Sequence, residues 1–162
     1  MYCNKNGQTY VNTLTPVPGA TAEDATYVVD LTHFTCGNRK ICANGAYPIA
    51  ADLNFKNSGL PQPVGLDTYV QDVLITGTVT YVPYKNGQNN CGCGCGCNCP
   101  VTENVWAVIS VPVTEATSPT LKAGETLASP TNLRDCCNVT NAVSLVCSFN
   151  VAGAAAAAGS GN

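Results

Sequence analysis

Apolar side chains recur at every second position through much of this 162-residue chain. Alternation of this kind puts one set of side chains on each face of an extended strand, so that one face is buried and the other meets solvent. No apolar stripe with the 3.6-residue period of a helix competes with it. The alternation therefore predicts long strands within residues 27–32, 47–55, 73–81, 105–113 and 142–151.

Turn signals separate these segments, among them Cys36-Gly37-Asn38, Asn86-Gly87 and Lys122-Ala123-Gly124. We expect an all-β fold of seven or eight strands in one domain, an antiparallel β-sandwich of jelly-roll type. Residues 1–24 are predicted to form an extended N-terminal arm, with a short strand near residues 8–14. Residues 25–152 form the sandwich, and the Ala/Gly-rich residues 153–162 form a loose tail.

The segment from Cys91 to Pro100 carries five of the eleven cysteines, at strict alternate positions. It lies in a predicted Cys/Gly-rich loop, residues 85–100, and long loops in a compact domain usually have a function. In extended backbone, consecutive cysteine α-carbons would stand about 6.5–7 Å apart, at or beyond the limit for a disulfide between them. The thiols would then face other strands or other chains. The glycines equally allow the backbone to coil around a soft metal ion.

Two chemistries are therefore open for this run. We expect disulfides, and the alternative is a thiolate site for zinc or another thiophilic metal. Either one uses the same five side chains: Cys91, Cys93, Cys95, Cys97 and Cys99.

The other six cysteines differ in their settings. Four are further disulfide candidates: Cys36, Cys42, Cys136 and Cys137. Cys147 occupies the apolar phase of its strand and is the candidate for a buried, unreactive thiol. Because eleven is an odd number, at least one thiol has no partner within a monomer. Cys3, which stands alone on the arm, is the candidate for a crosslink between chains.

The composition argues against two classes of partner. Charged residues make up 10% of the chain, well below the typical value of about 25%, and the net charge is −3. Nucleic-acid binding needs a basic surface, which this chain lacks. No apolar run approaches the length of about 18 residues that a membrane-spanning helix needs, so we expect no membrane insertion. The opening residues 1–7 contain no apolar segment, so we expect no classical signal peptide. A weakly charged surface favours association with copies of the same chain.

Catalytic signals are weak. The one histidine, His33, lies close to Cys36, and a Cys–His pair is able to activate a thiolate. His33 also shares its strand face with Leu31, which favours a structural histidine at a strand end. No orienting third group accompanies the pair, so we expect no enzymatic activity. A carbohydrate-binding face would need exposed aromatic side chains, for which the candidates, more simply read as core or interface residues, are Tyr10, Tyr69 and Trp106.

The chain resembles, in its organisation, the endospore appendage subunits of Gram-positive bacteria. The resemblance covers the overall strand pattern and the arm, on which Cys3 is the residue that transfers. Subunits of that family are jelly-roll proteins that stack into fibres and are cross-linked by disulfides from the N-terminal arm. The resemblance implies a self-assembling structural subunit of an extracellular or spore-surface fibre, stabilised by disulfide crosslinks.

Two other functions stay open: a secreted β-sandwich binding module or adhesin, and a thiolate-rich metal-binding protein. For self-assembly we expect strand addition, in which residues 8–14 of one copy complete a sheet of its neighbour. Residues 68–84 carry Asp72 as their one charge and are predicted to offer a poorly guarded edge.

Overall fold

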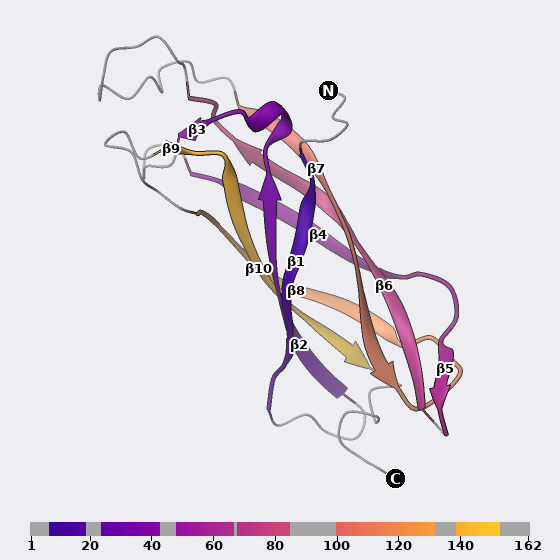
Figure 1. The fold of residues 1–162 in the computed structure, drawn as a ribbon. Coiled ribbons are helices and arrows are strands. Elements are labelled where there is room, and N and C mark those ends of the chain that lie inside the picture. Colours follow the sequence, from indigo (N-terminus) through magenta and orange to yellow (C-terminus); the bar gives the residue numbers. More distant parts are fainter. Residues whose placement is uncertain are drawn as a thin grey trace.

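The computed structural model describes residues 7–18, 24–42, 48–66, 68–84, 100–131 and 139–152 of the chain. These residues form two antiparallel sheets that face one another, a separate two-stranded pair, and one turn of 3₁₀ helix, Cys36–Asn38 (Figure 1). The prediction of an all-β antiparallel sandwich is confirmed. No helix within these ranges is long and apolar enough to cross a membrane.

The first sheet contains four strands, in the order β1 (Thr9–Pro16), β2 (Asp24–Phe34), β10 (Ala142–Ala152) and β8 (Thr120–Pro130). The second sheet is built on β6 (Thr68–Tyr81), which pairs along nearly its whole length with β7 (Val101–Val113). On its other side β6 pairs with β4 (Ala50–Asn57) and then with the short β5 (Gln62–Gly65). The separate pair joins β3 (Ile41–Cys42) to β9 (Val139–Thr140) at one end of the sandwich.

Apart from the short strands β3, β5 and β9, the chain runs through β1 and β2 in the first sheet, through β4, β6 and β7 in the second, and returns to the first in β8 and β10. β10 lies between β8 and β2, and β8 lies beside β4 of the opposite sheet. The described strands form the predicted sandwich, and its jelly-roll type stays a prediction.

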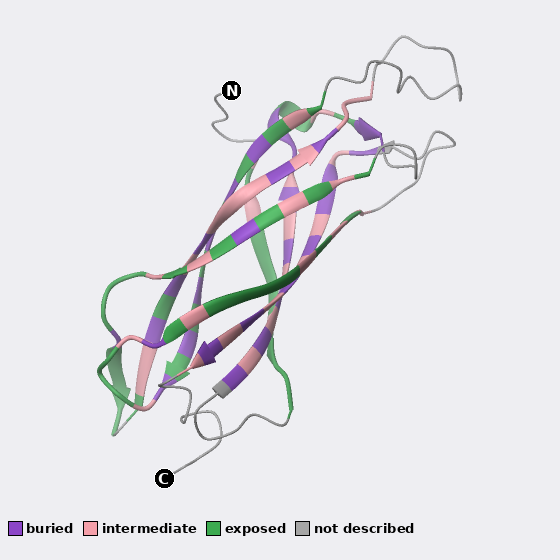
Figure 2. Ribbon diagram, turned by 180° about the vertical axis from the view of Figure 1, so that it is seen from behind, coloured by how far each residue is buried: buried purple, intermediate pink, exposed green. Residues whose placement is uncertain are grey.

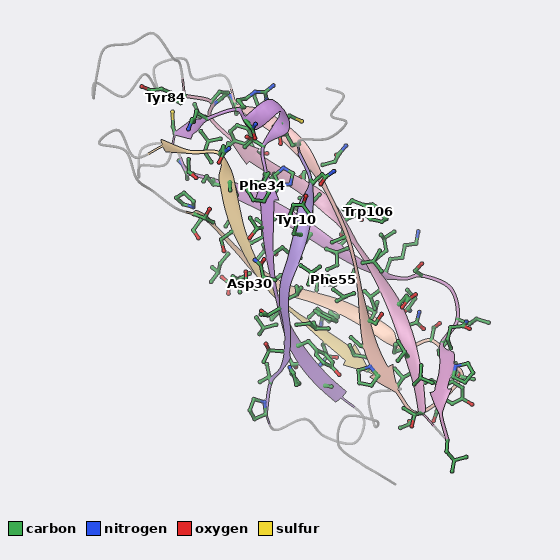
Figure 3. The ribbon with its side chains drawn as sticks, in the orientation of Figure 1. Tyr10, Asp30, Phe34, Phe55, Tyr84 and Trp106 are labelled. Atoms are coloured by element: carbon green, nitrogen blue, oxygen red, sulfur yellow. The ribbon has the colours of Figure 1, made fainter. Side chains whose placement is uncertain are left out.

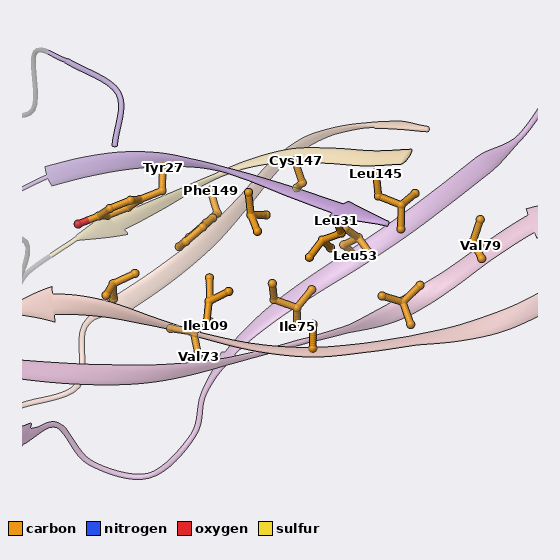
Figure 4. Close-up of a cluster of buried hydrophobic side chains, with 14 of the residues drawn as sticks. Tyr27, Leu31, Leu53, Val73, Ile75, Val79, Ile109, Leu145, Cys147 and Phe149 are labelled. Atoms are coloured by element: carbon orange, nitrogen blue, oxygen red, sulfur yellow. The ribbon is translucent and has the colours of Figure 1, made fainter. Parts of the chain in front are cut away.

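The core lies between the two sheets, where buried residues alternate with more exposed ones along β2, β7 and β10 (Figure 2). The ring of Phe149 on β10 is stacked between two others, 5.6 Å from Tyr27 on β2 and 4.4 Å from Phe55 on β4. Leu31, Ile75 and Leu145 continue the same layer of apolar side chains (Figure 4). The aromatic stack thus joins both sheets through van der Waals contact.

Three expectations about the chain's organisation change. Residues 9–16 are not a free arm, because β1 pairs with β2 of its own chain from Thr9 opposite His33 to Pro16 opposite Tyr27. The sandwich therefore begins before residue 25. Residues 68–84, which were predicted to offer an edge, contain β6. This strand has a neighbour on each side, and its low charge fits that interior position in the sheet. Lys122-Ala123-Gly124 is not a turn but lies within β8, where the register to β10 shifts between Cys147 and Phe149.

Two predicted segments fall outside the part of the chain that the structure describes. They are the Cys/Gly-rich loop from residue 85 to residue 99 and the tail, residues 153–162. Residues 1–6 of the predicted arm also lie outside it.

Gly77 on β6 marks a close approach of two strands. It is paired with Leu53 on β4, and a Cβ atom at this position would stand 2.0 Å from the backbone oxygen of Asp52. Because that oxygen belongs to the backbone, the strand itself must shift to make room. We expect Gly77→Ala to lower the free energy of unfolding by about 1–3 kcal/mol in urea denaturation.

The control for this prediction is Gly65→Ala. A Cβ atom at Gly65 on β5 would meet only the Cβ of Thr68, at 4.0 Å. Equal stability loss in the two variants would mean that the approach of β4 to Gly77 does not matter.

Candidate functional site

A cluster of polar side chains is buried at the end of the sandwich where β3 and β9 lie. Its centre is the carboxylate of Glu103, whose side chain is 2% exposed. Nε2 of His33 lies 2.9 Å from its Oε1, and the hydroxyl of Tyr81 donates to its Oε2. The backbone N–H of Cys36 donates to both carboxylate oxygens, each at 3.2 Å. We call these residues, together with Arg39, the Glu103 cluster.

Arg39 connects the cluster to the surface. Its guanidinium Nη1 lies 3.5 Å from Oε2 of Glu103 and donates to the Tyr81 hydroxyl at 3.2 Å, while its side chain stays 27% exposed. A carboxylate that accepts from several donors at once is strongly held, because hydrogen bonds to an ionised group are about twice as strong as neutral ones.

The cluster forms because each side chain points into the sandwich. His33 on β2 is in phase with buried Leu31, and Glu103 on β7 is in phase with buried Val105. β2 belongs to the first sheet, whereas β7 and β6, which carries Tyr81, belong to the second. The cluster therefore ties the two sheets together at this end.

A tight turn supplies the two remaining groups, the Cys36 amide and Arg39. The turn is closed by the Thr35 hydroxyl, which donates to the Arg39 carbonyl at 2.5 Å. Gly37 and Asn38 both have left-handed backbone, with φ of 64° and 57°. These are the residue types that adopt this conformation at low cost, so the predicted turn signal does describe the local structure.

The hydrogen bonds keep the centre of the cluster ionised. Burial alone would raise the pKa of Glu103, but the hydrogen bonds from His33, Tyr81 and the Cys36 amide outweigh it and hold that pKa below its ordinary value. Burial raises the pKa of Tyr81, and so does its hydrogen bond to Glu103, against an opposing effect of Arg39. Tyr81 therefore remains a hydroxyl that donates to Glu103.

His33 also reaches the outermost strand of its sheet. Its Nδ1 lies 2.9 Å from the hydroxyl of Thr9 on β1. A hydroxyl, an imidazole and a carboxylate in a row is the order found in acyl-transfer triads. Here His33 is fully buried and the carboxylate is engaged by three other donors. We interpret the row as a structural tie that holds β1 to both sheets.

The structure describes three of the eleven cysteines. Cys147 is a free thiol, fully buried on β10, and burial raises its pKa despite a hydrogen bond from Thr126. Cys36 and Cys42 are buried and disulfide-bonded, and the partner of each lies beyond what the described residues show. The remaining cysteines lie outside the described residues: Cys3, Cys91, Cys93, Cys95, Cys97, Cys99, Cys136 and Cys137.

Metal and carbohydrate sites were also expected as alternatives. Among the residues that the structure describes, no three His, Cys, Asp or Glu side chains come together as a metal site. The three aromatic candidates do not share a face. Trp106 is exposed on the second sheet and Tyr10 is exposed on the first, where its ring meets that of Phe34 at 5.7 Å (Figure 3). Tyr69 is partly buried against the core.

The two lateral sides of the sandwich differ in charge. On one side lie the edge strands β4 and β8, linked by a hydrogen bond from Asn57 to the Pro119 carbonyl at 2.7 Å. This side carries four charged side chains: Asp52, Lys56, Lys122 and Glu125. The other side has the edge strands β1 and β7, which lie near each other. β1 contains no charged residue, and the one in β7 is buried Glu103.

Neither β1 nor β7 has a second strand partner among the described residues. Each therefore presents backbone N–H and C=O groups along one edge, where natural proteins usually place charges or prolines against unwanted pairing. Here the prolines are confined to the strand ends, at Pro16 and Pro112. We call β1 and β7 together the uncharged side.

Comparison with other proteins gives no relative: no family model, no curated protein and no solved structure matches this chain.

Sequence reasoning identified His33 but missed its partners. The signal for Glu103 is present, because it occupies the inward phase of the alternation that continues through Val105, Ala107 and Ile109. A carboxylate whose side chain points inward needs a buried hydrogen-bond donor. The chain's one histidine also points inward and is able to supply that hydrogen bond. Tyr81 and Arg39 become recognisable only once the register of the strands is known.

Proposed function

We propose that this chain is a structural subunit that assembles with copies of itself into a fibre reinforced by disulfides, on an extracellular or spore surface. The observation that carries the proposal is the uncharged side formed by β1 and β7. A monomer that stays single would be expected to guard such long edges with charges, as this one does along β4 and β8.

Strand addition is the mode of association that these edges support. If β7 of one copy pairs with β1 of the next, the contact is heterologous, and repeated contacts of that kind build an open filament. Main-chain hydrogen bonds supply the affinity in such pairing. Since β1 already belongs to its own sheet, the contact differs from the predicted one: β1 offers its free edge and need not leave β2.

The surface next to the β7 edge supports the same proposal. Trp106 and Val108 are 62% and 43% exposed on the outer face of β7, and Val108 is paired with Leu74 on β6. An added strand would cover part of these apolar side chains. Few charged side chains would have to lose their contact with water, because Glu103, the one charged residue of β7, is already paired inside the sandwich.

Covalent reinforcement comes in this proposal from the cysteines, with Cys3 as the crosslink between chains. Cys3 lies six residues before Thr9, the first residue of β1. A thiol tethered that close to the free edge meets the neighbouring subunit at high effective concentration once two copies have docked.

Charge introduced on the β7 edge tests the proposal. We expect Val108→Lys to raise the concentration needed for assembly by about tenfold or more, because the ammonium group would be buried against the added strand. Light scattering at increasing protein concentration measures this directly.

The matched control is Thr78→Lys on β6. Thr78 faces outward on the central strand, between Asp52 on β4 and Asn104 on β7. The same charge there leaves both edges unchanged, so assembly should be nearly as in the wild type. If Val108→Lys assembles like Thr78→Lys, the β7 edge is not the interface.

A further inference from the structure

The Glu103 cluster has a property that self-assembly does not require. Its hydrogen bonds converge on one ionisable carboxylate, and they come from three separate parts of the fold: β2 through His33, β6 through Tyr81, and the turn through the Cys36 amide and Arg39. The ionisation state of one group therefore decides how firmly all three parts are joined.

We infer that the Glu103 cluster is an acid-operated latch, which holds the turn from Thr35 to Arg39 while Glu103 is ionised and loosens it when Glu103 is protonated. A carboxylate accepts from every one of its neighbours, whereas a carboxylic acid must itself donate one hydrogen. The hydrogen bonds that remain are no longer charge-assisted and lose about half their strength. The Cys36 amide is directly affected by this loss, since it donates to both oxygens of the Glu103 carboxylate.

The same carboxylate also acts on β1. Because a carboxylate only accepts, the hydrogen of its bond to His33 is on Nε2, and Nδ1 faces the Thr9 hydroxyl. Protonation of Glu103 weakens the hold on the imidazole and hence on Thr9. The turn and the beginning of β1 are thus expected to loosen together, ahead of the central strands.

The sign of the pH dependence follows from the lowered pKa of Glu103. A carboxyl group whose pKa is lower in the folded chain than in the unfolded chain stabilises the fold. This contribution is complete above the pKa of the unfolded chain, here about 4.5, and is lost as the pH falls through the pKa of the folded chain. Among the described residues, the titratable or charged side chains that face Glu103 are His33 from β2, Tyr81 from β6 and Arg39 from the turn. The hydrogen bonds from His33 and Tyr81 favour the ionised form of Glu103, and Nη1 of Arg39 lies 3.5 Å from its Oε2.

Hydrogen exchange followed by NMR tests the latch on the full chain. The reporter is the protection factor of the Cys36 amide, and the reference is the amide of Val29, which lies on β2 between β1 and β10 and reports opening of the whole sheet. Below pH 4.5 we expect the protection of Cys36 to fall about tenfold relative to that of Val29, as expected when a hydrogen bond loses its charged acceptor.

Two variants make the test decisive. Glu103→Gln, which is neutral at every pH, should show low Cys36 protection without a pH-dependent step. Tyr81→Phe removes a donor that lowers the pKa of Glu103, so its step should move to higher pH. The latch is refuted if wild-type Cys36 protection follows Val29 at all pH values, or if the step persists unchanged in Glu103→Gln.

Discussion

Replacing Glu103 with Ala is expected to lower the free energy of unfolding by about 3–5 kcal/mol, the cost of removing one partner from a buried charged network. The loss is large because three donors would remain buried without an acceptor: Nε2 of His33, the Tyr81 hydroxyl and the Cys36 amide. Urea denaturation at neutral pH measures it.

The control for Glu103 is Glu115→Ala. Glu115 is exposed between β7 and β8, and removing it should change stability by less than about 0.5 kcal/mol. Similar costs for the two variants would show that the Glu103 cluster does not hold the sheets together.

Phe149→Ala is expected to cost about 3–5 kcal/mol, as is usual when a buried aromatic ring is truncated and leaves a cavity. Phe149 is stacked on Tyr27 of its own sheet and on Phe55 of the opposite sheet, so the cavity would open between the two sheets. Trp106→Ala removes a larger ring from the outer face of β7 and is the control, with little expected effect on the unfolding of a monomer. If the exposed substitution costs as much, the aromatic stack is not the centre of the core.

The long buried strands were predictable because burial on one face imposes strict alternation. Residues 105–113 were expected to form a strand, and the structure extends that strand back to Val101 as β7. Strands β8 and β5 have no such pattern, because they lie at edges and expose most of their residues. Gly124 in β8 and the prolines before and within β5 therefore look like turn signals, although their backbone pairs with a neighbouring strand.

Pairing between distant segments was not predictable from local pattern. Residues 9–16 have too few apolar side chains to indicate burial, and only Leu14 packs against the core. Their position depends on backbone hydrogen bonds to β2, which any sequence is able to make. The same limit applies to the candidate site. His33 was placed correctly on the face of Leu31, but its contact with Glu103 spans 70 positions in the chain.

Electron microscopy of the purified wild-type chain, with and without reductant, is the most direct test of the central claim that this chain is a fibre subunit. The proposal predicts filaments under oxidising conditions, built of one repeating subunit and absent or much shorter for Val108→Lys. It also predicts that filaments formed without reductant resist denaturant better than those treated with it. Monodisperse single particles at every concentration, in oxidised and reduced samples alike, would contradict the proposal.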